Sequence, residues 1–374
     1  MTHMYNKLQI VYNKQVKEII RNTKMKETED LAKIKKDDKT YRIVSNIYWK
    51  DGLFAVYKHV ASRIIKAYED GEIPVVDLKH YKNILFKDGR EYFDNAWEYF
   101  FKQPAGIGID ELDGKNVIID PTLRTSWPNK AYEIIPQLWL PRDKNDRRKH
   151  PYAERYAELL QFNDKMKQYF KTAKEKYFGD EKEILGIIMR GSDYVMCRPC
   201  THSIPPDIEE VIKKAKELQS ELHYKKIYLA TEDKKYYDRF KQEFGEMLIE
   251  NAQYKYQRTD ITDYIASVKI GTRKNHLYNL QKEYACSIYL VSQCKYLIGS
   301  ICNATFGAYF MSNCFDNYDY VYLWDKGVYL PIPNYNNILE RIFSVKNIIS
   351  SNKKHKCLTI FGIRIKFKKH MQHQ

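Results

Sequence analysis

The sequence predicts an α/β fold with parallel sheets, because short apolar segments alternate with amphipathic helical segments. Residues 184–189 (Ile-Leu-Gly-Ile-Ile-Met) and residues 226–230 (Lys-Ile-Tyr-Leu-Ala) have the composition of buried strands. Between them, residues 205–218 begin with two prolines, carry acids in the first turn and repeat apolar residues three and four apart, which predicts a helix. The order strand, helix, strand is that of a βαβ unit.

Polar residues follow both strands. Arg190 and Asp193 come after the first strand, and Thr231, Glu232 and Asp233 come after the second. Ligands of open α/β sheets bind outside the carboxyl ends of the strands, so these residues are expected to face a crevice. A guanidinium offers a planar fork of donors that matches phosphate oxygens and stays charged at any working pH. Arg190 is therefore a candidate phosphate ligand, and the alternative is a structural ion pair between Arg190 and Asp193.

A third segment, residues 289–311, reads as helix, short strand, small polar loop and helix. Ser300, Asn303 and Thr305 are thereby placed at a helix start, where backbone and hydroxyl donors can meet a phosphate.

A separate α/β organisation begins near residue 41, with a strand over 41–49, a turn at Asp51 and Gly52, a helix to Tyr68 and a strand over 73–77. We therefore expect a helical arm over residues 1–40, a first domain over 41–170, a second domain over 171–345 and a basic tail over 346–374. The aromatic residues of 81–101, Trp97 and Phe100 among them, line either an acceptor groove or the core.

The three strand ends resemble, in order and spacing, the three short motifs of the fucosyltransferase superfamily. This superfamily includes core α-fucosyltransferases, rhizobial nodulation fucosyltransferases and protein O-fucosyltransferases. Residues 189–193 look like its His-x-Arg-Arg-x-Asp motif, residues 227–233 like its Tyr-Leu-Ala-Thr-Asp-Asp motif, and residues 292–311 like its third motif. His202 and residues 208–210 look like the His-Pro-Ile-Glu-Glu stretch of the core enzymes.

The resemblance implies a GT-B-like α/β fold, with two Rossmann-like domains facing across a cleft. It further implies an inverting glycosyltransferase that moves fucose from GDP-fucose to a glycan acceptor in surface polysaccharide or glycoconjugate biosynthesis, without a metal or other cofactor. Arg190 would hold the β-phosphate, aided by Ser300, Asn303 and Thr305, and the carboxylates after Thr231 would contact guanine. Gly52 would belong to a glycine turn near the donor crevice.

Three positions depart from the family pattern. Ile188 stands where the family often has histidine, and Gly191 stands where many members have a second arginine. Arg198 stands where the core enzymes carry a glutamate proposed as the catalytic base, and an arginine cannot accept a proton. Either the base lies elsewhere in the chain, with Asp193, His202 and Asp51 as the candidates, or the acceptor differs in kind.

Composition bounds the class of protein. The 374 residues are 44% hydrophobic and 14% aromatic, which is typical of a globular chain long enough for two domains. No apolar stretch approaches the roughly 18 residues of a membrane span, and the first residues do not resemble a signal peptide, so we expect a cytoplasmic enzyme. Seven cysteines, an odd number, favour reduced thiols. Cys197 and Cys200 form a lone CxxC, which is weak evidence for zinc or redox chemistry.

The formal net charge is +15, and residues 346–374 contain no acidic residue. The natural partner of this tail is an anionic surface, which predicts peripheral binding to the inner face of the cell membrane, near a lipid-linked oligosaccharide acceptor. A nucleic-acid binder shows a similar charge, but no RNA- or DNA-reading motif is present, so no nucleic-acid partner is expected.

Two alternative functions remain from the sequence. One is a GT-B transferase that uses another nucleotide sugar. The other is a catalytically inactive glycan-binding or membrane-docked protein, which Gly191 and Arg198 suggest.

Overall fold

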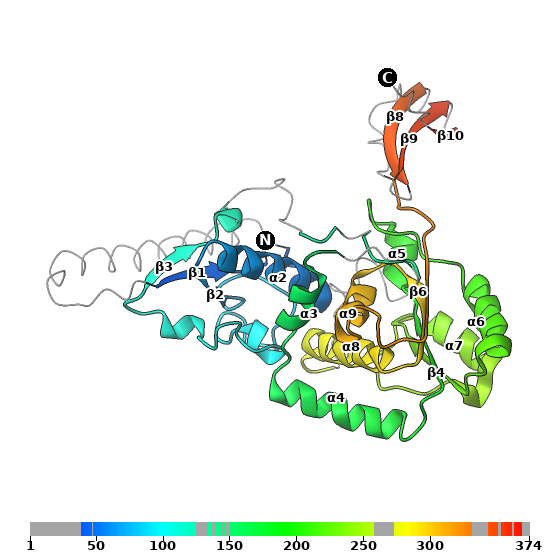
Figure 1. Ribbon diagram of the computed structural model, residues 1–374, viewed down its shortest axis with the longest axis horizontal. Helices are drawn as coiled ribbons and strands as arrows, with labels where there is room; N and C mark the ends of the chain where they lie inside the picture. Colours follow the sequence, from blue (N-terminus) through cyan, green and yellow to red (C-terminus); the bar gives the residue numbers. More distant parts are fainter. Residues whose placement is uncertain are drawn as a thin grey trace, which may run out of the picture.

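The computed structural model describes residues 39–46, 48–124, 134–136, 139–143, 146, 150–257, 273–330, 343–350, 353–360 and 363–368. These residues form two parallel sheets and one antiparallel sheet (Figure 1). The predicted α/β class with two Rossmann-like units is confirmed. The predicted N-terminal arm lies outside the described residues, except for its last two positions.

The first sheet has the order β2-β1-β3, and all its strands are parallel. Its strands are β1 (Thr40–Val44), β2 (Ile73–Val76) and β3 (Asn116–Ile119), and α2 (Leu53–Glu69) connects β1 to β2. The helix and the second strand agree with the sequence prediction. The first strand ends at Val44, earlier than predicted. In the residues that follow, the side chains bind backbone carbonyls: Ser45 donates to Asp77 O and Asn46 donates to Tyr48 O.

The described part of this domain also contains the short 3₁₀ helices η1 (Ala96–Tyr99), η2 (Ile109–Glu111) and η3 (Pro121–Arg124). The aromatic residues around η1 belong to the core, since Trp97 and Phe100 are 1% and 0% exposed. The Trp97 ring lies 4.4 Å from that of Phe101, and its Nε1 donates to Lys102 O at 3.0 Å. Trp97 and Phe100 therefore belong to the core and do not line an acceptor groove.

The second sheet has the order β5-β4-β6-β7, again with all strands parallel. Its strands are β4 (Ile184–Ile188), β5 (Lys226–Ala230), β6 (Tyr296–Ser300) and β7 (Tyr320–Trp324). Helices α6 (Ile208–Leu222) and α7 (Lys234–Phe244), the latter followed by η4 (Gly245–Met247), pack on one face of this sheet. Helices α8 (His276–Ser292) and α9 (Asn303–Met311) pack on the other face. The remaining helices are α3 (Ala153–Leu159), α4 (Asp164–Tyr177) and α5 (Ser192–Cys197).

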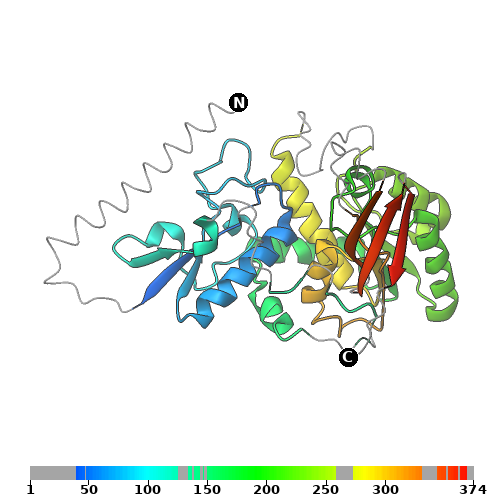
Figure 2. The same cartoon turned by 90° about the horizontal axis from the view of Figure 1, so that it is seen from above.

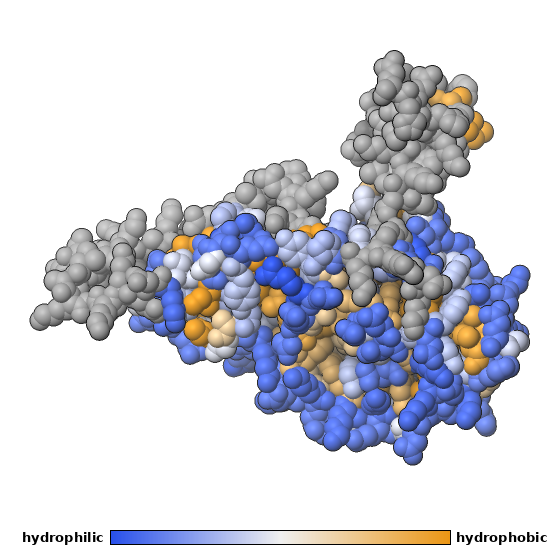
Figure 3. All heavy atoms as spheres, viewed as in Figure 1, coloured by the Kyte–Doolittle hydropathy of each residue, from blue (hydrophilic) through white to orange (hydrophobic). Residues whose placement is uncertain are grey.

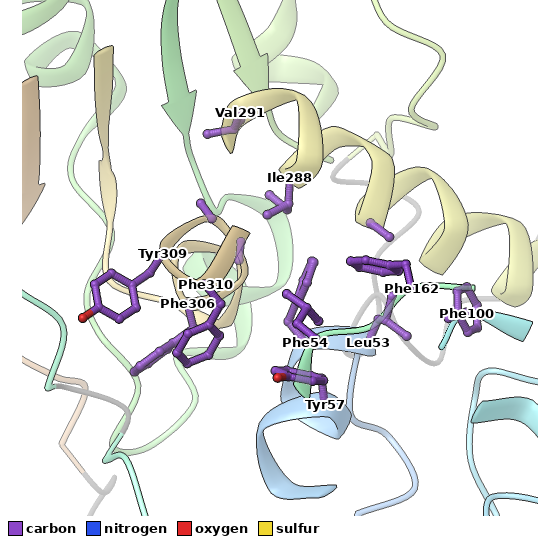
Figure 4. Packing of buried hydrophobic residues seen from close by; sticks show 14 of the residues in the cluster. Leu53, Phe54, Tyr57, Phe100, Phe162, Ile288, Val291, Phe306, Tyr309 and Phe310 are labelled. Atoms are coloured by element: carbon purple, nitrogen blue, oxygen red, sulfur yellow. The ribbon is translucent and has the colours of Figure 1, made fainter. Parts of the chain in front are cut away.

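One continuous hydrophobic core joins the two domains, with α2, α8 and α9 lying between the two parallel sheets (Figures 1 and 2). Phe54 and Tyr57 of α2 face Phe306 and Phe310 of α9 (Figure 4). The contact is close, because a Cβ added at Gly307 would lie 2.7 Å from the Phe54 ring. The first domain is thus packed directly on the face of the second that carries α8 and α9.

The predicted domain limits stay predictions. The limit at residues 170 and 171 falls within α4, which packs on α8 through the stacked rings of Phe170 and Tyr289 at 4.7 Å. The last described strands, β8 (Phe343–Ser350), β9 (Lys353–Ile360) and β10 (Ile363–Lys368), form a separate antiparallel sheet in the order β10-β9-β8. Among the described residues, no helix has both the length and the apolar character that a membrane span needs.

Candidate functional site

The strand register brings the polar strand ends to one level. Ile188, the last residue of β4, pairs with Ala230 of β5 on one side and with Gly299 of β6 on the other. Two residues beyond these paired positions, Arg190 is therefore level with Glu232 and with the loop that leads into α9. The two strands approach closely here, since a Cβ at Gly299 would lie 2.9 Å from Ile188 O.

Arg190 is held by two neighbours at this level. Its Nη1 lies 2.9 Å from Glu232 Oε1, and its Cζ lies 4.5 Å from the ring centroid of Tyr194 on α5. The Arg190 side chain keeps 21% exposure, whereas that of Glu232 keeps 8%. A guanidinium restrained on two sides loses less conformational entropy when it binds an anion. Arg190 is thus a partly open, preorganised cation.

The carboxylates that follow β5 have different structural roles. Asp233 is fully buried and caps α7, where its Oδ1 accepts from Tyr236 N at 3.2 Å. Its own N–H donates to Thr231 Oγ1 at 3.2 Å, so Thr231 shapes the same turn. Glu232 is the carboxylate that pairs with Arg190.

The backbone at Gly191 explains one departure from the family pattern. A Cβ at this position would lie 2.6 Å from Asp233 Oδ2 and 2.7 Å from Tyr236 Cε2. Both neighbours are buried, and Asp233 is fixed by its capping bond, so neither can give way cheaply. A second arginine therefore cannot stand beside Arg190 without rearranging the start of α7.

The loop from β6 to α9 contributes unsatisfied polar atoms. Within the described part of the chain, Ser300 Oγ and Asn303 Oδ1 are buried and have no hydrogen-bond partner. The start of α9 also lacks a side-chain cap, so its first N–H groups are available to a ligand. Thr305 differs from the other two predicted residues, because it is fully buried and its hydroxyl donates to Ser300 O. Thr305 holds the loop in shape.

Tyr284 of α8 connects this site to the first domain. Its ring meets that of Phe54 edge-on at 5.2 Å. Loss of hydration raises the pKa of Tyr284 well above its usual value, with Arg190 opposing the rise and Glu232 adding to it. The Tyr284 side chain is half-buried. Nearby, Leu53 N donates to Gln281 Oε1 at 2.8 Å, which fixes the turn at Gly52 against α8.

The same turn carries Asp51, which has a partner that sequence reasoning missed. His59 Nε2 lies 3.4 Å from Asp51 Oδ2, and Asn46 Nδ2 donates to the same oxygen at 3.3 Å. Burial, together with the charges of Lys58 and Arg63, lowers the pKa of His59 well below its usual value. His59 is therefore neutral at physiological pH. The sequence offered no spacing signal for this contact, because Asp51 comes before α2 and residues eight apart on a helix lie about 12 Å apart.

The other predicted residues lie on the second domain. His202 is half-buried, its ring meets that of Tyr194 edge-on at 5.4 Å, and its Nδ1 lies 3.0 Å from Cys200 O. Arg198 is exposed and ends α5 in a left-handed conformation. Asp193 lies in α5, and its side chain is outside the described part of the structure.

The cysteines of the described residues form no disulfide bond. Cys286, Cys294 and Cys302 are buried, and burial raises the pKa of Cys286 to about 12. In the described ranges, no group of three or more His, Cys, Asp or Glu side chains is placed to hold a metal ion.

Comparisons with known proteins found distant structural similarities alone. No family model matches the chain, and no curated protein matches it. NodZ α-1,6-fucosyltransferase co-crystallised with GDP is similar in structure, with 15% identity, a TM-score of 0.43 and coverage of 77% of this chain and 96% of that one. POFUT1 in its apo form has 9% identity, a TM-score of 0.42 and coverage of 78% and 99%. A FUT1 variant of Arabidopsis thaliana in complex with GDP has 12% identity, a TM-score of 0.38 and coverage of 81% and 77%.

TM-scores below 0.5 describe a distant likeness of fold and leave the donor and the acceptor open.

The neutral, buried state of His59 predicts a loss of stability in acid. The unfolded chain binds a proton at His59 below about pH 6.5, whereas the folded chain does so only at lower pH, so the free energy of unfolding falls as pH drops below 6.5. One such proton corresponds to a slope of about 1.4 kcal/mol per pH unit. His59→Gln is expected to flatten this slope, as measured by urea unfolding between pH 5 and 8.

His80→Gln is the control with opposite sign. The bond to Asp77 raises the pKa of His80, so its stabilisation is present in acid and is lost as pH rises through that raised pKa. Removing it should steepen the acid loss. An unchanged slope in His59→Gln would show that His59 is not held neutral.

Proposed function

We propose that this chain is an inverting glycosyltransferase with a nucleotide-sugar donor, GDP-fucose, and a glycan or lipid-linked oligosaccharide as acceptor. The observation that carries the proposal is Arg190, a restrained and partly open cation at the end of β4, level with the loop that presents the unpartnered Ser300 hydroxyl. The choice of fucose and guanine rests on the resemblance of the three motifs. A place in surface polysaccharide or glycoconjugate synthesis rests on the same resemblance.

The proposed role of this group of residues is to stabilise the leaving diphosphate. Arg190, the Ser300 hydroxyl and the first N–H groups of α9 would meet its oxygens, while Asn303 would donate through its amide. Fixed donors aimed at developing charge commonly supply the largest catalytic contribution. As the bond to the diphosphate breaks, the glycosyl carbon gains oxocarbenium character, and attack by the acceptor hydroxyl from the opposite face inverts the configuration.

Among the three candidates, Asp51 is the proposed base. It lies on the first domain, whereas Asp193 and His202 lie on the second, and Leu53, two residues after Asp51, donates to Gln281 of α8. Asn46 and His59 hold the Asp51 carboxylate in place, since both contact its Oδ2. His202, in contrast, lies beside Tyr194 and hence on the phosphate side.

A different nucleotide sugar is the second candidate donor. Asp233 is committed to capping α7 and Glu232 to Arg190, so neither carboxylate is positioned as a dedicated reader of guanine. The nucleobase preference therefore has to be tested alongside the phosphate site.

Arg190→Ala is expected to weaken GDP binding at least a hundredfold, because the charge-assisted bond to the diphosphate is lost. Calorimetry with GDP, UDP and ADP in the presence of EDTA measures their dissociation constants. Comparing wild type with Arg190→Ala gives the contribution of the phosphate contact, and comparing the three nucleotides gives the nucleobase preference. Arg198→Ala, which removes an exposed cation eight residues away, should bind like the wild type. Equal GDP affinity in wild type and Arg190→Ala would remove the phosphate site, and a preference for UDP would favour the second candidate.

Asp51→Asn is expected to leave GDP affinity unchanged and to slow GDP-fucose hydrolysis about a hundredfold or more, since general base catalysis contributes on the order of 10²–10⁴. Released fucose is the readout, with water standing in for the acceptor. Asp110→Asn, which removes an exposed carboxylate paired with Lys79 in the same domain, is the control. Full activity in Asp51→Asn together with loss in His202→Gln or Asp193→Asn would move the base to the second domain.

We also propose that the antiparallel sheet binds an anionic membrane surface. The register pairs Ile360 with Ile363 and Leu358 with Ile365, so four apolar residues lie together on one face. Ile363 is 68% exposed and Ile365 is 44% exposed, and apolar surface is visible at this sheet (Figure 3). Each basic residue near acidic lipid contributes about 1 kcal/mol, and inserted apolar side chains add to this. The basic residues of β9 and β10 are Lys353, Lys354, Lys356, Arg364, Lys366 and Lys368.

The double variant Ile363→Asp/Ile365→Asp is expected to lower cosedimentation with vesicles of phosphatidylserine and phosphatidylcholine at least tenfold, because both insertion and attraction weaken. Wild type should bind pure phosphatidylcholine vesicles poorly. Phe93→Asp, at a 69% exposed position on the first domain, is the matched control. A concentration-dependent dimer that the double variant dissociates would instead assign the face to a second copy.

A further inference from the structure

We infer that Glu232 is an internal counter-ion of the phosphate site, which holds Arg190 in place while the site is empty and competes with the bound diphosphate for the same guanidinium. This inference rests on the proposed function, because it takes the anion that Arg190 binds to be a diphosphate. Its consequence is that Glu232 limits nucleotide affinity and speeds the release of the product.

The backbone around Glu232 keeps its carboxylate in this position. Tyr256 N donates to Glu232 O at 2.7 Å, and Lys234 N donates to Tyr256 O at 3.0 Å, so the residue lies between two bonds to a neighbouring segment. The next residue, Asp233, is fixed as the cap of α7. The carboxylate therefore cannot leave Arg190 through a movement of the main chain alone.

The ion pair between Arg190 and Glu232 lowers the net positive charge that an arriving anion meets. The 2.9 Å contact joins one positive and one negative charge, and the Glu232 side chain is 8% exposed, so water screens the pair weakly. A second arginine is excluded at position 191 by the contacts of a Cβ with Asp233 and Tyr236. A diphosphate that reaches Arg190 thus meets a carboxylate bound to the same group, and their repulsion lowers the affinity.

This role differs from reading the nucleobase, which the motif resemblance implies for a carboxylate after Thr231. A base reader gains affinity from its carboxylate, whereas a counter-ion of Arg190 costs affinity. Neutralising Glu232 therefore changes nucleotide binding in opposite directions under the two roles. A ligand without a base separates them further.

The test compares wild type, Glu232→Gln and Glu232→Ala in calorimetric titrations with pyrophosphate, GDP and guanosine. Both variants should bind pyrophosphate and GDP at least tenfold more tightly, and guanosine with unchanged affinity. GDP dissociation, followed by stopped-flow with a fluorescent GDP analogue, should slow about tenfold. Adding Arg190→Ala to Glu232→Gln should abolish the gain.

Glu209→Gln is the matched control, because it breaks a glutamate–arginine pair of similar length, 2.8 Å to Arg239, on the outer surface of α6 and α7. It should change none of these affinities. The inference is overturned if both Glu232 variants bind pyrophosphate no more tightly than wild type, or if GDP and guanosine weaken together. Tighter pyrophosphate binding in a protein that shows no preference for GDP would keep the counter-ion and reject the proposed nucleotide.

Discussion

The packing of α2 against α8 and α9 is the constraint on which the site depends. Phe54 fills the space that the missing side chain of Gly307 leaves, and Gln281 holds the backbone at Leu53. Both contacts lie in the first turn of α2, directly after the turn that carries Asp51. Since protein interiors are close-packed, this interface allows little sliding of one domain over the other. The start of α2 therefore keeps a fixed position against α8, where the Phe54 ring meets that of Tyr284.

Within the second domain, the polar groups at the strand ends divide between support and chemistry. Thr231, Asp233 and Thr305 are almost completely buried and make local hydrogen bonds, so they shape the loops. Arg190 and Ser300 retain the capacity to meet a ligand, the first through exposure and the second through an unused hydroxyl. This division follows from burial, because a buried polar group without a partner costs folding free energy and is retained only at a few positions.

A site built around a single restrained arginine has a further physical consequence. Leaving a guanidinium half-buried without a counter-charge is costly, and Glu232 offsets that cost in the empty protein. The same carboxylate then opposes any anion that arrives. Stability of the empty site and affinity for the ligand are therefore in conflict at this pair, as is common where strain or charge is stored for function.

The sequence alone determined the main strands and helices of the second domain and the polar residues that follow β4 and β5. Apolar composition located β4 and β5, proline and acidic residues located α6, and the position of Arg190 after β4 marked it as a site residue. These features are local, since strand burial and helix periodicity are visible within a few residues. The end of β1 was missed, and the bonds that Ser45 and Asn46 make to backbone carbonyls after it are not visible in apolar periodicity.

Only the tertiary structure decided the roles within the site. The sheet order β5-β4-β6-β7 brings Glu232 beside Arg190 and removes the space for a side chain at Gly191, while helix α2 brings His59 to Asp51. Such contacts join residues that no spacing rule relates. They depend on strand neighbours and on register, which are set by the packing of the whole chain.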